Sequence, residues 1–502
     1  MLWLASILAI ALLGAEDCFV IQVVDAQTQR GVPLVELRTV NEISYWTDSQ
    51  GIVALREPEL EGQNVFFNVE SHGYEFPADG FGIRGQALLV ERGKSATLKI
   101  NRVNIAQRLY RITGGGIYRD SVMAGRSVPI EHPLLNALVI GSDSVEQVAY
   151  RGKLYWFWGD TLRHGYPLGN FHVPGATSDL PGQGGLDPGA GINLSYFLDA
   201  PGDETPSTKG FAKGTAKMPG EGPTWIQAVT VVPDAAGKEQ MYAGYIKVKP
   251  PLEVYARGLA RFNSDKQAFE KVADVSMDAP IMPDGYAFRH REGDVDYVYF
   301  AKPYALTRVR ATAEEYLQPS HYEAWTCLKP GSRMEQPSLD RDDQGRVRYA
   351  WKRDTPAVGP AEQATLIKNG LLKESEAWLK LRDTATGKPV VLHNGTVAWN
   401  AYRQRWISIA VQHYGSSLLG EMWYSEAPAP HGPFAKAVKI VTHNDYSFYN
   451  PRQHPVFDQE GGRLIYFEGT YTRTFSGNKR PTPRYEYNQM MYRLDLGDPR
   501  LK

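Results

Sequence analysis

Cysteine and net charge are what this sequence has least of. Only two cysteines, Cys18 and Cys327, occur in 502 residues, so a disulfide framework is excluded and the fold must be stabilised by its hydrophobic core. The 55 Lys and Arg residues nearly cancel the 56 Asp and Glu residues, which leaves a formal net charge of -1. Proteins that bind the phosphate backbone carry an excess of basic side chains, so this balance argues against nucleic acid as a partner.

Long apolar runs are also missing after the first residues. The stretch from Leu2 to Ala15 is uncharged and apolar but too short to span a membrane. It is typical of a secretory signal peptide over residues 1–15, although no Lys or Arg precedes it and a buried first strand is the alternative. We therefore expect a secreted or periplasmic protein with no integral membrane segment after signal removal.

Glycine, proline and aromatic residues are abundant by contrast. The 48 Gly and 33 Pro residues favour many tight turns and disfavour a helical bundle. Aromatic side chains make up 11% of the chain and recur in short alternating runs. These features predict an all-β protein.

The first part of the chain, residues 19–103, alternates apolar and polar positions in short runs that are separated by turn residues. This spacing predicts a small β-sandwich. Three segments, Val24-Asp25, Gly31–Val35 and Thr47–Ile52, resemble the carboxypeptidase regulatory-like (transthyretin-like) domains that precede many exported bacterial enzymes. The resemblance implies an Ig/transthyretin-like accessory module without catalysis.

Five pairs of strands rich in Tyr and Trp follow in residues 110–495, and they predict a five-bladed β-propeller. Residues 166–191 read as a long rim loop, and helical spacing over Ala361–Arg382 predicts a short helical insertion. The predicted strand pairs cover residues 145–150 with 153–158, 225–230 with 240–245, 286–288 with 296–300, 395–400 with 405–410, and 454–457 with 463–467.

Carboxylates near the starts of inner strands are the first candidates for chemistry, because these starts converge on the central channel of a propeller. Asp143 opens the inner strand of the first unit, Asp160 follows the second strand of that unit, and Glu221 opens the second unit. Two carboxyl groups suffice to cleave a glycosidic bond: one protonates the leaving oxygen and the other activates water or attacks the anomeric carbon. For Asp160 the alternative is a turn former, and for Glu221 a solvated acid.

The segments Phe157–Thr161, Glu221–Pro223, Ser425–Pro428 and Gly432–Phe434, together with the five units, resemble the five-bladed propeller glycoside hydrolases. The nearest patterns are those of the family 43 arabinanases and xylosidases and of the family first described as domain of unknown function 4185, which includes endo-D-arabinanases. The resemblance covers about residues 110 to 495.

Family 43 enzymes use an Asp base in the first blade, an Asp that modulates pKa values, and a Glu acid before Gly-Pro. The resemblance implies that Asp143 is the base and Glu221 the acid, with Asp160 as a second acid of the first blade. The modulating Asp has no clear counterpart in the next blade, where Asp284 is a candidate for it.

Aromatic rings and hydrogen-bonding side chains near these acids are the predicted substrate-binding residues, because rings stack on sugar faces and amide or basic groups bind hydroxyls. Each has a structural alternative, such as a surface ion pair for the two glutamates or a core position for the histidine. The predicted set is Trp158, Trp225, Tyr286, Glu335, Asn450, Arg452, His454 and Glu468.

Neither a His-x-x-x-His nor a Cys-x-x-Cys spacing occurs, so we predict no metal among the catalytic groups and no cofactor, with a structural calcium ion left open. The sequence thus predicts an exported glycoside hydrolase that acts on a polysaccharide or oligosaccharide. The alternative is a non-catalytic carbohydrate-binding or cell-surface propeller protein.

Overall fold

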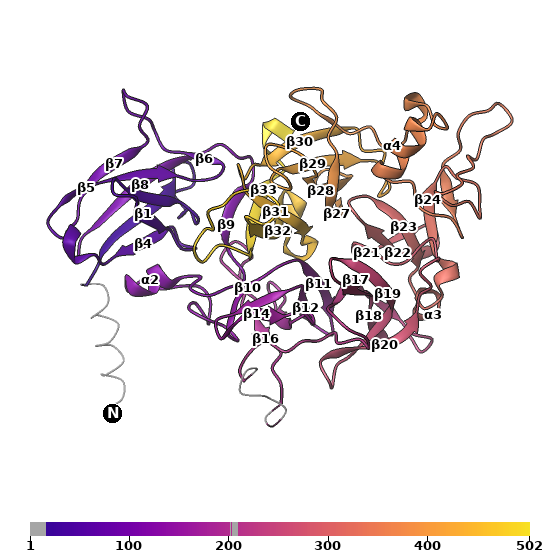
Figure 1. Cartoon of the computed structure of the whole chain (residues 1–502), viewed down its shortest axis with the longest axis horizontal. Coiled ribbons are helices and arrows are strands. Elements are labelled where there is room, and N and C mark those ends of the chain that lie inside the picture. Colours follow the sequence, from indigo (N-terminus) through magenta and orange to yellow (C-terminus); the bar gives the residue numbers. More distant parts are fainter. Residues whose placement is uncertain (1–16, 201, 203–208, 502) are drawn as a thin grey trace.

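The computed structural model describes residues 17–200, 202 and 209–501, so the predicted signal peptide lies outside the described residues. It is an all-β structure in which a β-sandwich lies beside a five-bladed β-propeller (Figure 1). Within the described residues, no helix combines the length and apolar character needed to cross a membrane.

The sandwich consists of two four-stranded sheets. Alternate residues of both sheets, among them Ile21, Leu37, Phe67 and Leu98, form one buried core between them. One sheet has the order β4 (Ile52–Leu55), β1 (Phe19–Asp25), β8 (Ser95–Arg102), β6 (Tyr74–Glu75), and the other β3 (Ser44–Trp46), β2 (Glu36–Thr39), β5 (Asn64–Glu70), β7 (Gly85–Leu89).

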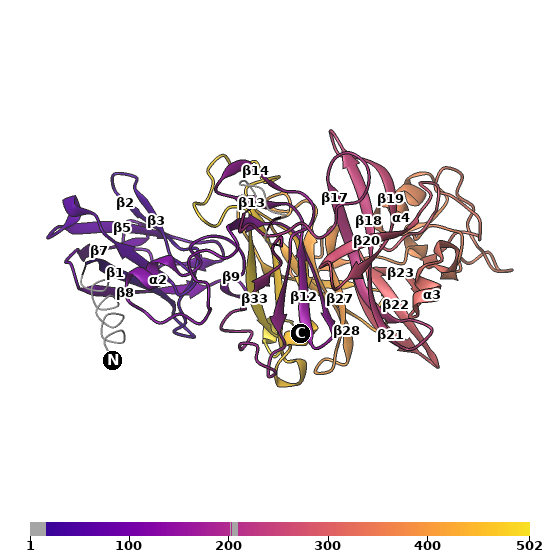
Figure 2. The same cartoon turned by 90° about the horizontal axis from the view of Figure 1, so that it is seen from below.

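The propeller blades, numbered 1 to 5 along the chain, follow one another around a ring, seen face-on in Figure 1 and edge-on in Figure 2. Blade 1 contains β11 (Val145–Tyr150), β12 (Lys153–Trp158), β15 (Gly175–Asp179) and β16 (Ser195–Tyr196), and blade 2 contains β17 (Thr224–Pro233), β18 (Glu239–Lys249), β19 (Glu253–Asn263) and β20 (Ala268–Asp274). Blade 3 contains β21 (Tyr286–Glu292), β22 (Val295–Ala301), β23 (Ala305–Arg310), β24 (Glu323–Thr326) and β25 (Ala350–Lys352). Blade 4 contains β27 (Leu392–Asn400), β28 (Arg405–Gln412), β29 (Met422–Ala427), β30 (Lys436–Val441) and β26 (Arg382–Asp383).

Blade 5 closes the ring with strands from both ends of the propeller. Its inner strands are β31 (Ser447–Gln453), β32 (Leu464–Thr472) and β33 (Asn488–Asp495), and its outer strand is β9 (Gln107–Arg111), which directly follows the sandwich. Antiparallel pairing of β9 with β33 therefore ties the start of the propeller to its end. Buried aromatic and aliphatic side chains fill the space between each pair of neighbouring blades, which is where most of the aromatic residues are used.

Helices are short and lie outside the sheets. They are α2 (Arg119–Met123), α3 (Ala313–Tyr316), α4 (Pro360–Lys368) and the 3-10 turns η1 (Pro58–Leu60), η2 (Pro319–His321), η3 (Glu374–Glu376), η4 (Pro455–Phe457), η5 (Glu460–Gly462) and η6 (Pro499–Leu501). The predicted helical insertion is confirmed as α4 followed by η3, with Gly370 at φ 71° after the helix C-cap.

Two sequence-based expectations for local structure were wrong. Residues 166–191 are not a single loop, because they contain β14 (Tyr166–Asn170) and β15, which pairs with β12. The inner strand of blade 5 is β31 rather than residues 454–457, which form η4. Proline explains the second error: Pro455 takes the first position of the 3-10 turn, while Pro451 lies within β31 at an irregularity in its pairing.

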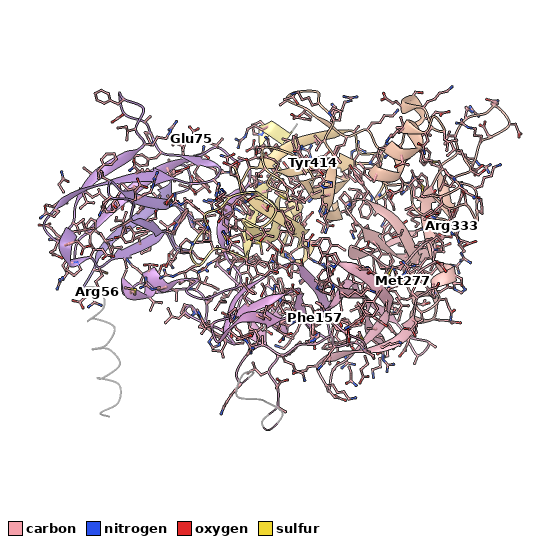
Figure 3. The ribbon with its side chains drawn as sticks, viewed as in Figure 1. Arg56, Glu75, Phe157, Met277, Arg333 and Tyr414 are labelled. Carbon is pink, nitrogen blue, oxygen red and sulfur yellow. The ribbon has the colours of Figure 1, made fainter. Side chains whose placement is uncertain are left out.

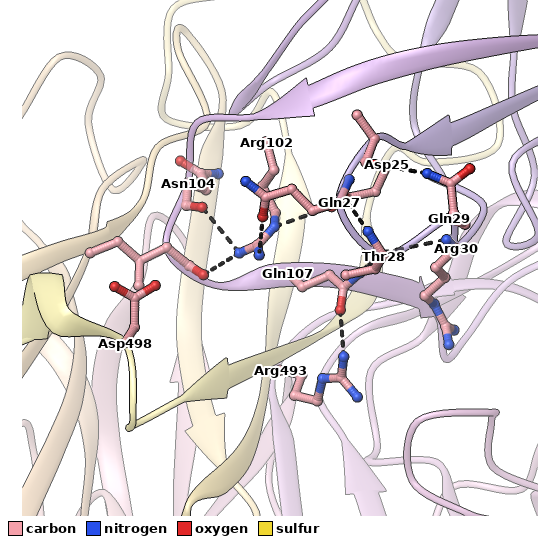
Figure 4. Close-up of polar contacts among 12 residues, drawn as sticks. Asp25, Gln27, Thr28, Gln29, Arg30, Arg102, Asn104, Gln107, Arg493 and Asp498 are labelled. Atoms are coloured by element: carbon pink, nitrogen blue, oxygen red, sulfur yellow. Dashed lines mark hydrogen bonds and ion pairs between the residues drawn. The ribbon is translucent and has the colours of Figure 1, made fainter.

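Polar contacts join the sandwich to the propeller near the segment that connects β8 to β9 (Figure 4). Within the sandwich, Arg102 on β8 donates to Asp25 Oδ2 on β1 at 3.2 Å, and it also donates to the carbonyl of Asn104, in the segment that leads to β9, at 3.3 Å. Gln107 on β9 donates to Thr28 Oγ1 at 2.9 Å and accepts from Arg493 at 2.7 Å. The sandwich also contributes Leu34 to the apolar core between blades 4 and 5, so the two parts share a core.

Arg108 on β9 is the most connected side chain of this interface and is only 1% exposed. Its guanidinium donates to the carbonyls of Pro33, His72 and Leu34 at 3.0, 3.0 and 3.3 Å and to Ser71 Oγ at 2.5 Å. A planar fork is needed to reach these acceptors together.

Replacing Arg108 by Lys is therefore expected to lower the free energy of unfolding by about 2 kcal/mol, because the ammonium group leaves buried carbonyls without a donor. Urea unfolding measures the loss. Arg92→Lys is the matched control, since Arg92 is 56% exposed and lies 3.7 Å from Glu61. Equal stability of the Arg108→Lys chain and the wild type would contradict this role.

Candidate active site

Asp143 and Asp160 lie opposite each other in a break between two strand ladders. β11 and β12 end their pairing at Val145 and Trp158, and the chain continues into a small sheet of β10 (Val139–Ser142), β13 (Thr161–Arg163) and β14. The two acids occupy the unpaired residues between these ladders. The Asp143 N–H donates to the Asp160 carbonyl at 3.1 Å, which holds the two acids side by side.

Gly159 is required for this close approach. Its N–H donates to the Asp143 carbonyl at 2.9 Å, and a Cβ at this position would lie 2.2 Å from Asp143 Oδ1. Any side chain here would displace the carboxyl group. Gly159 before Asp160 therefore does more than form a turn, because it leaves room for the Asp143 carboxyl group.

The two carboxyl groups influence each other's protonation. Burial, followed by the negative charge of Asp143, raises the pKa of Asp160 to about 7, and the Trp225 indole partly opposes this shift. Burial also raises the pKa of Asp143, while the hydroxyls of Tyr449 and Tyr487 oppose that shift. One oxygen of each acid, Oδ1, is buried without a hydrogen-bond partner in the described structure.

Tyr449 on β31 gives Asp143 its best-defined partner. The Tyr449 hydroxyl donates to Asp143 Oδ2 at 2.7 Å, and burial together with the Asp143 charge raises the pKa of the phenol. Tyr487, just before β33, also has its phenol pKa raised by burial and by Asp143 and Asp160. The two phenol hydroxyls therefore favour the ionised form of Asp143 and oppose the effect of its burial.

The turn that carries Asp143 is braced by blade 5. Ser144 has a φ of 46°, and its N–H donates to Thr470 Oγ1 at 2.9 Å. Gln489 donates to the same Thr470 oxygen at 2.8 Å and to the Ser142 carbonyl at 3.2 Å. Because both Thr470 and Gln489 are fully buried, the position of Asp143 is fixed by the core.

Asn450 connects the inner strands of four blades. It lies on β31 with a φ of 48°, donates to Ser144 Oγ at 2.7 Å and accepts from Asn394 Nδ2 on β27 at 2.8 Å. Its carbonyl accepts from the Tyr286 hydroxyl on β21 at 2.8 Å. The half-buried Trp225 on β17 adds the remaining blade, so all five inner strands contribute to one site.

Arg452 and Glu146 form an ion pair deeper in the channel. The Arg452 guanidinium donates to Glu146 Oε2 at 2.8 Å and to the Gln147 carbonyl, and it lies over the Tyr286 ring at 4.8 Å. The other Glu146 oxygen accepts from the Ala228 N–H at 3.3 Å. This pair links blades 1, 2, 3 and 5, and Arg452 lies two residues after Asn450 on the same strand, β31.

Three predicted site residues are not in this group. The Glu221 side chain is exposed on the loop before β17, and no hydrogen bond or ion pair in the described part of the chain joins it to Asp143 or Asp160. Glu335 is exposed on the loop between the outer strands β24 and β25, whose position Arg333 marks in Figure 3. Asp284, just before β21, pairs with Lys302 at 2.9 Å.

Three others lie in the core between blades 5 and 1. His454 Nε2 and Glu468 Oε1 form a fully buried pair at 2.7 Å, and the His454 ring lies 5.3 Å from Trp156. Trp158 is 1% exposed and stacks on Trp156 at 6.3 Å. These side chains support the inner strands and present no exposed surface to a ligand.

Sequence reasoning missed the contributions of Tyr487 and Glu146. Only Glu146 left a signal, as a charged residue inside an apolar inner strand. It also missed the exposed rings on this face, Tyr414 and Phe475, which are 71% and 54% exposed. The Phe475 ring meets the Tyr449 ring edge to face at 5.4 Å, and the Tyr414 ring, labelled in Figure 3, stacks on His413 at 4.3 Å.

Across residues 17–200, 202 and 209–501, no group of three or more His, Cys, Asp or Glu side chains is arranged to hold a metal ion.

No protein-family model matches the chain, and neither does any curated protein. Solved structures similar to it include an exo-β-1,3-galactanase from Phanerochaete chrysosporium (TM-score 0.36, 11% identity, 71% of this chain and 61% of that one). Others are a putative exo-β-1,3-galactanase from Bifidobacterium bifidum s17 (0.35, 11%, 78% and 94%) and an α-L-arabinanase from Penicillium chrysogenum in complex with arabinobiose (0.35, 11%, 78% and 99%). These values are too low to transfer an activity or a substrate.

Proposed function

We propose that this protein hydrolyses glycosidic bonds of a polysaccharide or oligosaccharide at the site around Asp143 and Asp160. The observation that carries the proposal is this pair of adjacent carboxyl groups just beyond the β11–β12 ladder, of which one has a pKa of about 7 and the other binds a phenol hydroxyl. Two carboxyl groups in different protonation states are what acid-catalysed cleavage with a base or nucleophile requires.

The environments of the two acids suggest their roles. Asp160 keeps its proton to near neutral pH and donates it to the leaving glycosidic oxygen as the bond to the anomeric carbon breaks. Asp143, whose Oδ2 accepts from Tyr449, is the carboxylate that activates water or attacks the anomeric carbon. In this assignment Asp160 replaces Glu221 as the proton donor, since the Glu221 side chain is exposed and no hydrogen bond or ion pair among the described residues joins it to Asp143.

Neighbouring groups suit a sugar ligand. The Asn394 and Asn450 amides can exchange hydrogen bonds with hydroxyl groups, and the exposed rings of Tyr414 and Phe475 offer faces for stacking at the rim. We also propose that the protein is exported, since residues 1–15 have the sequence pattern of a secretory signal peptide. The sandwich would then be a rigid accessory module attached to blade 5.

Incubation of the full chain with a panel of polysaccharides, followed by measurement of new reducing ends, tests the proposal. Soluble oligosaccharides are expected from at least one member of the panel. Retention of the protein on a glycan affinity gel without any product would instead support the non-catalytic carbohydrate-binding protein and would overturn the hydrolase.

The Trp225 indole offers a prediction with a defined sign. Because this indole lowers the pKa of Asp160, Trp225→Phe should raise that pKa further above its ordinary value of 3.8. The alkaline limb of the pH–rate profile should therefore move to higher pH, while the acid limb, set by Asp143, stays in place. A profile of kcat/KM from pH 4 to 9 measures both limbs, and a shift of the alkaline limb to lower pH would contradict the contact.

A further inference from the structure

A groove between the sandwich and the propeller lies apart from the candidate active site. It has a volume of about 500 Å³, within the usual range for small-molecule sites, which often lie between domains. Its walls come from β3 and β4 of the sandwich, from α2, from Arg111 on β9 and from residues 483–485 before β33. Arg56 marks its sandwich edge in Figure 3.

Three guanidinium groups line this groove, and two of them, those of Arg119 and Arg484, share the carboxylate of Asp120. Arg119 donates to Asp120 Oδ1 at 3.1 Å and Arg484 donates to Asp120 Oδ2 at 3.3 Å. Arg111 pairs with no carboxylate within the described structure; its guanidinium donates to the Gly115 carbonyl at 3.0 Å and to the Arg484 carbonyl. Asp48, the other acid of the inner wall, is occupied by three backbone N–H groups.

Arg111 is the least satisfied of these cations. It is 2% exposed, its Nε lies buried without a hydrogen-bond partner in the described residues, and burial lowers its pKa to about 10. Its guanidinium also lies over the Tyr485 ring at 4.8 Å. A buried cation with no paired anion is costly, and an anionic ligand would offset that cost.

The remaining lining favours a ring-shaped anion over a bare ion. Tyr45 and Trp46 of β3 line the sandwich side, and half-buried aromatic rings there provide apolar faces next to the arginines. At the outer edge Arg56 is already paired with Asp17 at 2.7 Å. The lining also contains the acids Asp48, Glu57 and Asp120, so the cationic side of the groove is formed by Arg111, Arg119 and Arg484.

We propose that this groove binds the carboxylate of an acidic sugar, such as a uronic acid residue of a glycan chain. The carboxylate lies between Arg119 and Arg484 in reach of Arg111, and the sugar ring packs against Tyr45 and Trp46. The site would give the protein an affinity for acidic glycans that does not depend on hydrolysis at Asp143 and Asp160.

Calorimetric titration of the full chain with digalacturonate, neutral galactobiose and sodium sulfate, at equal ionic strength, tests the proposal. The Asp143→Asn background keeps the sugars intact, and a positive result does not require the proposed hydrolase activity. Digalacturonate should bind at least about tenfold more tightly than galactobiose or sulfate, in line with the strength of charge-assisted hydrogen bonds. Sulfate binding as tightly as digalacturonate would show a simple anion site and overturn the sugar part.

Two sets of variants locate the binding. Arg119→Gln with Arg484→Gln should weaken digalacturonate binding by roughly tenfold or more, whereas the corresponding Lys pair, which keeps the charge, should weaken it less. Arg92→Gln, on the sandwich surface outside the groove, should leave it unchanged. If the double Gln variant melts early, Arg484→Gln alone, at a 45% exposed side chain, carries the test. An unchanged affinity in a folded variant would overturn the proposal.

Discussion

Replacing Asp143 or Asp160 by Asn is expected to lower kcat by roughly 10²–10⁴-fold, the usual effect of removing an acid or base from its reaction. The amides keep the size of the side chains but can neither donate the proton that Asp160 holds nor provide the carboxylate that Tyr449 binds on Asp143. KM should change much less, because neither group is proposed to contribute mainly to ground-state binding. Release of reducing ends from the best substrate of the panel measures both constants.

The identity of the leaving group separates the roles of the two acids. An aryl glycoside with an acidic phenol needs little protonation to depart, so Asp160→Asn should recover most of its rate on this substrate. Asp143→Asn should not recover, because the missing carboxylate acts on the anomeric carbon or its water. Recovery by Asp143→Asn instead would reverse the assignment.

Glu221→Gln is the informative comparison. The exposed Glu221 side chain makes no contact with Asp143 in the described structure, so its amide variant is expected to keep most of the activity. A loss as large as that of Asp160→Asn would restore the role that the family 43 resemblance implies for Glu221. Full activity of Asp143→Asn, Asp160→Asn and Glu221→Gln would show that hydrolysis does not take place at the site around Asp143 and Asp160.

Thermal melting shows whether the Asn variants are folded. For Asp160→Asn the melting temperature at pH 8 is expected to stay the same or rise, whereas a simple loss of contacts would lower it. The folded protein raises the pKa of Asp160 from 3.8 to about 7, so ionisation of this group opposes folding as the pH rises through that interval. Asp160→Asn removes the buried charge. The variant should melt at or above the wild-type temperature at pH 8 and show no such gain at pH 4.

The sequence was most informative where local pattern and local structure coincide. Period-two alternation located the first two strands of blades 1 to 4, because each hairpin is formed by neighbouring residues and has one buried face. The position of Asp143 and Asp160 at strand ends also followed from spacing alone. Pairing between distant segments was not visible in the same way, and the closure of blade 5 by β9 was therefore missed.

The limits of sequence reasoning are clearest for His454 and Glu468. Both were predicted substrate-binding residues because they lie near strand ends, yet they pair with each other in the core between two blades. Fourteen residues separate them, so only the antiparallel register of β31 and β32 brings them together. The same dependence on distant partners explains why Tyr487 was missed, since its role arises from its contact with Asp143 between the neighbouring blades 5 and 1.

Loss of Arg452 should have the largest effect on stability. Arg452→Met leaves Glu146 buried without its cation, and breaking such a pair from one side costs about 3–5 kcal/mol. Urea unfolding at pH 8 measures the loss. The Asn450 contacts to Ser144 and Asn394 lie directly above this pair, so activity should fall together with stability.

Protonation of Glu146 provides the decisive comparison. Burial raises the pKa of Glu146 to about 7 even with Arg452 present, and removal of the cation raises it further. A carboxyl group with a raised folded-state pKa costs stability only where it would be ionised, so the Arg452→Met loss should be smaller at pH 5 than at pH 8. Replacing both partners, by Arg452→Met with Glu146→Leu, should recover most of the loss, because two apolar side chains leave no unpaired charge in the channel. Two results would contradict this role of the charge: an Arg452→Met stability loss that is the same at pH 5 and pH 8, or a double variant whose loss equals the sum of the two single losses. Either result would mean that Arg452 stabilises the protein by packing against Tyr286.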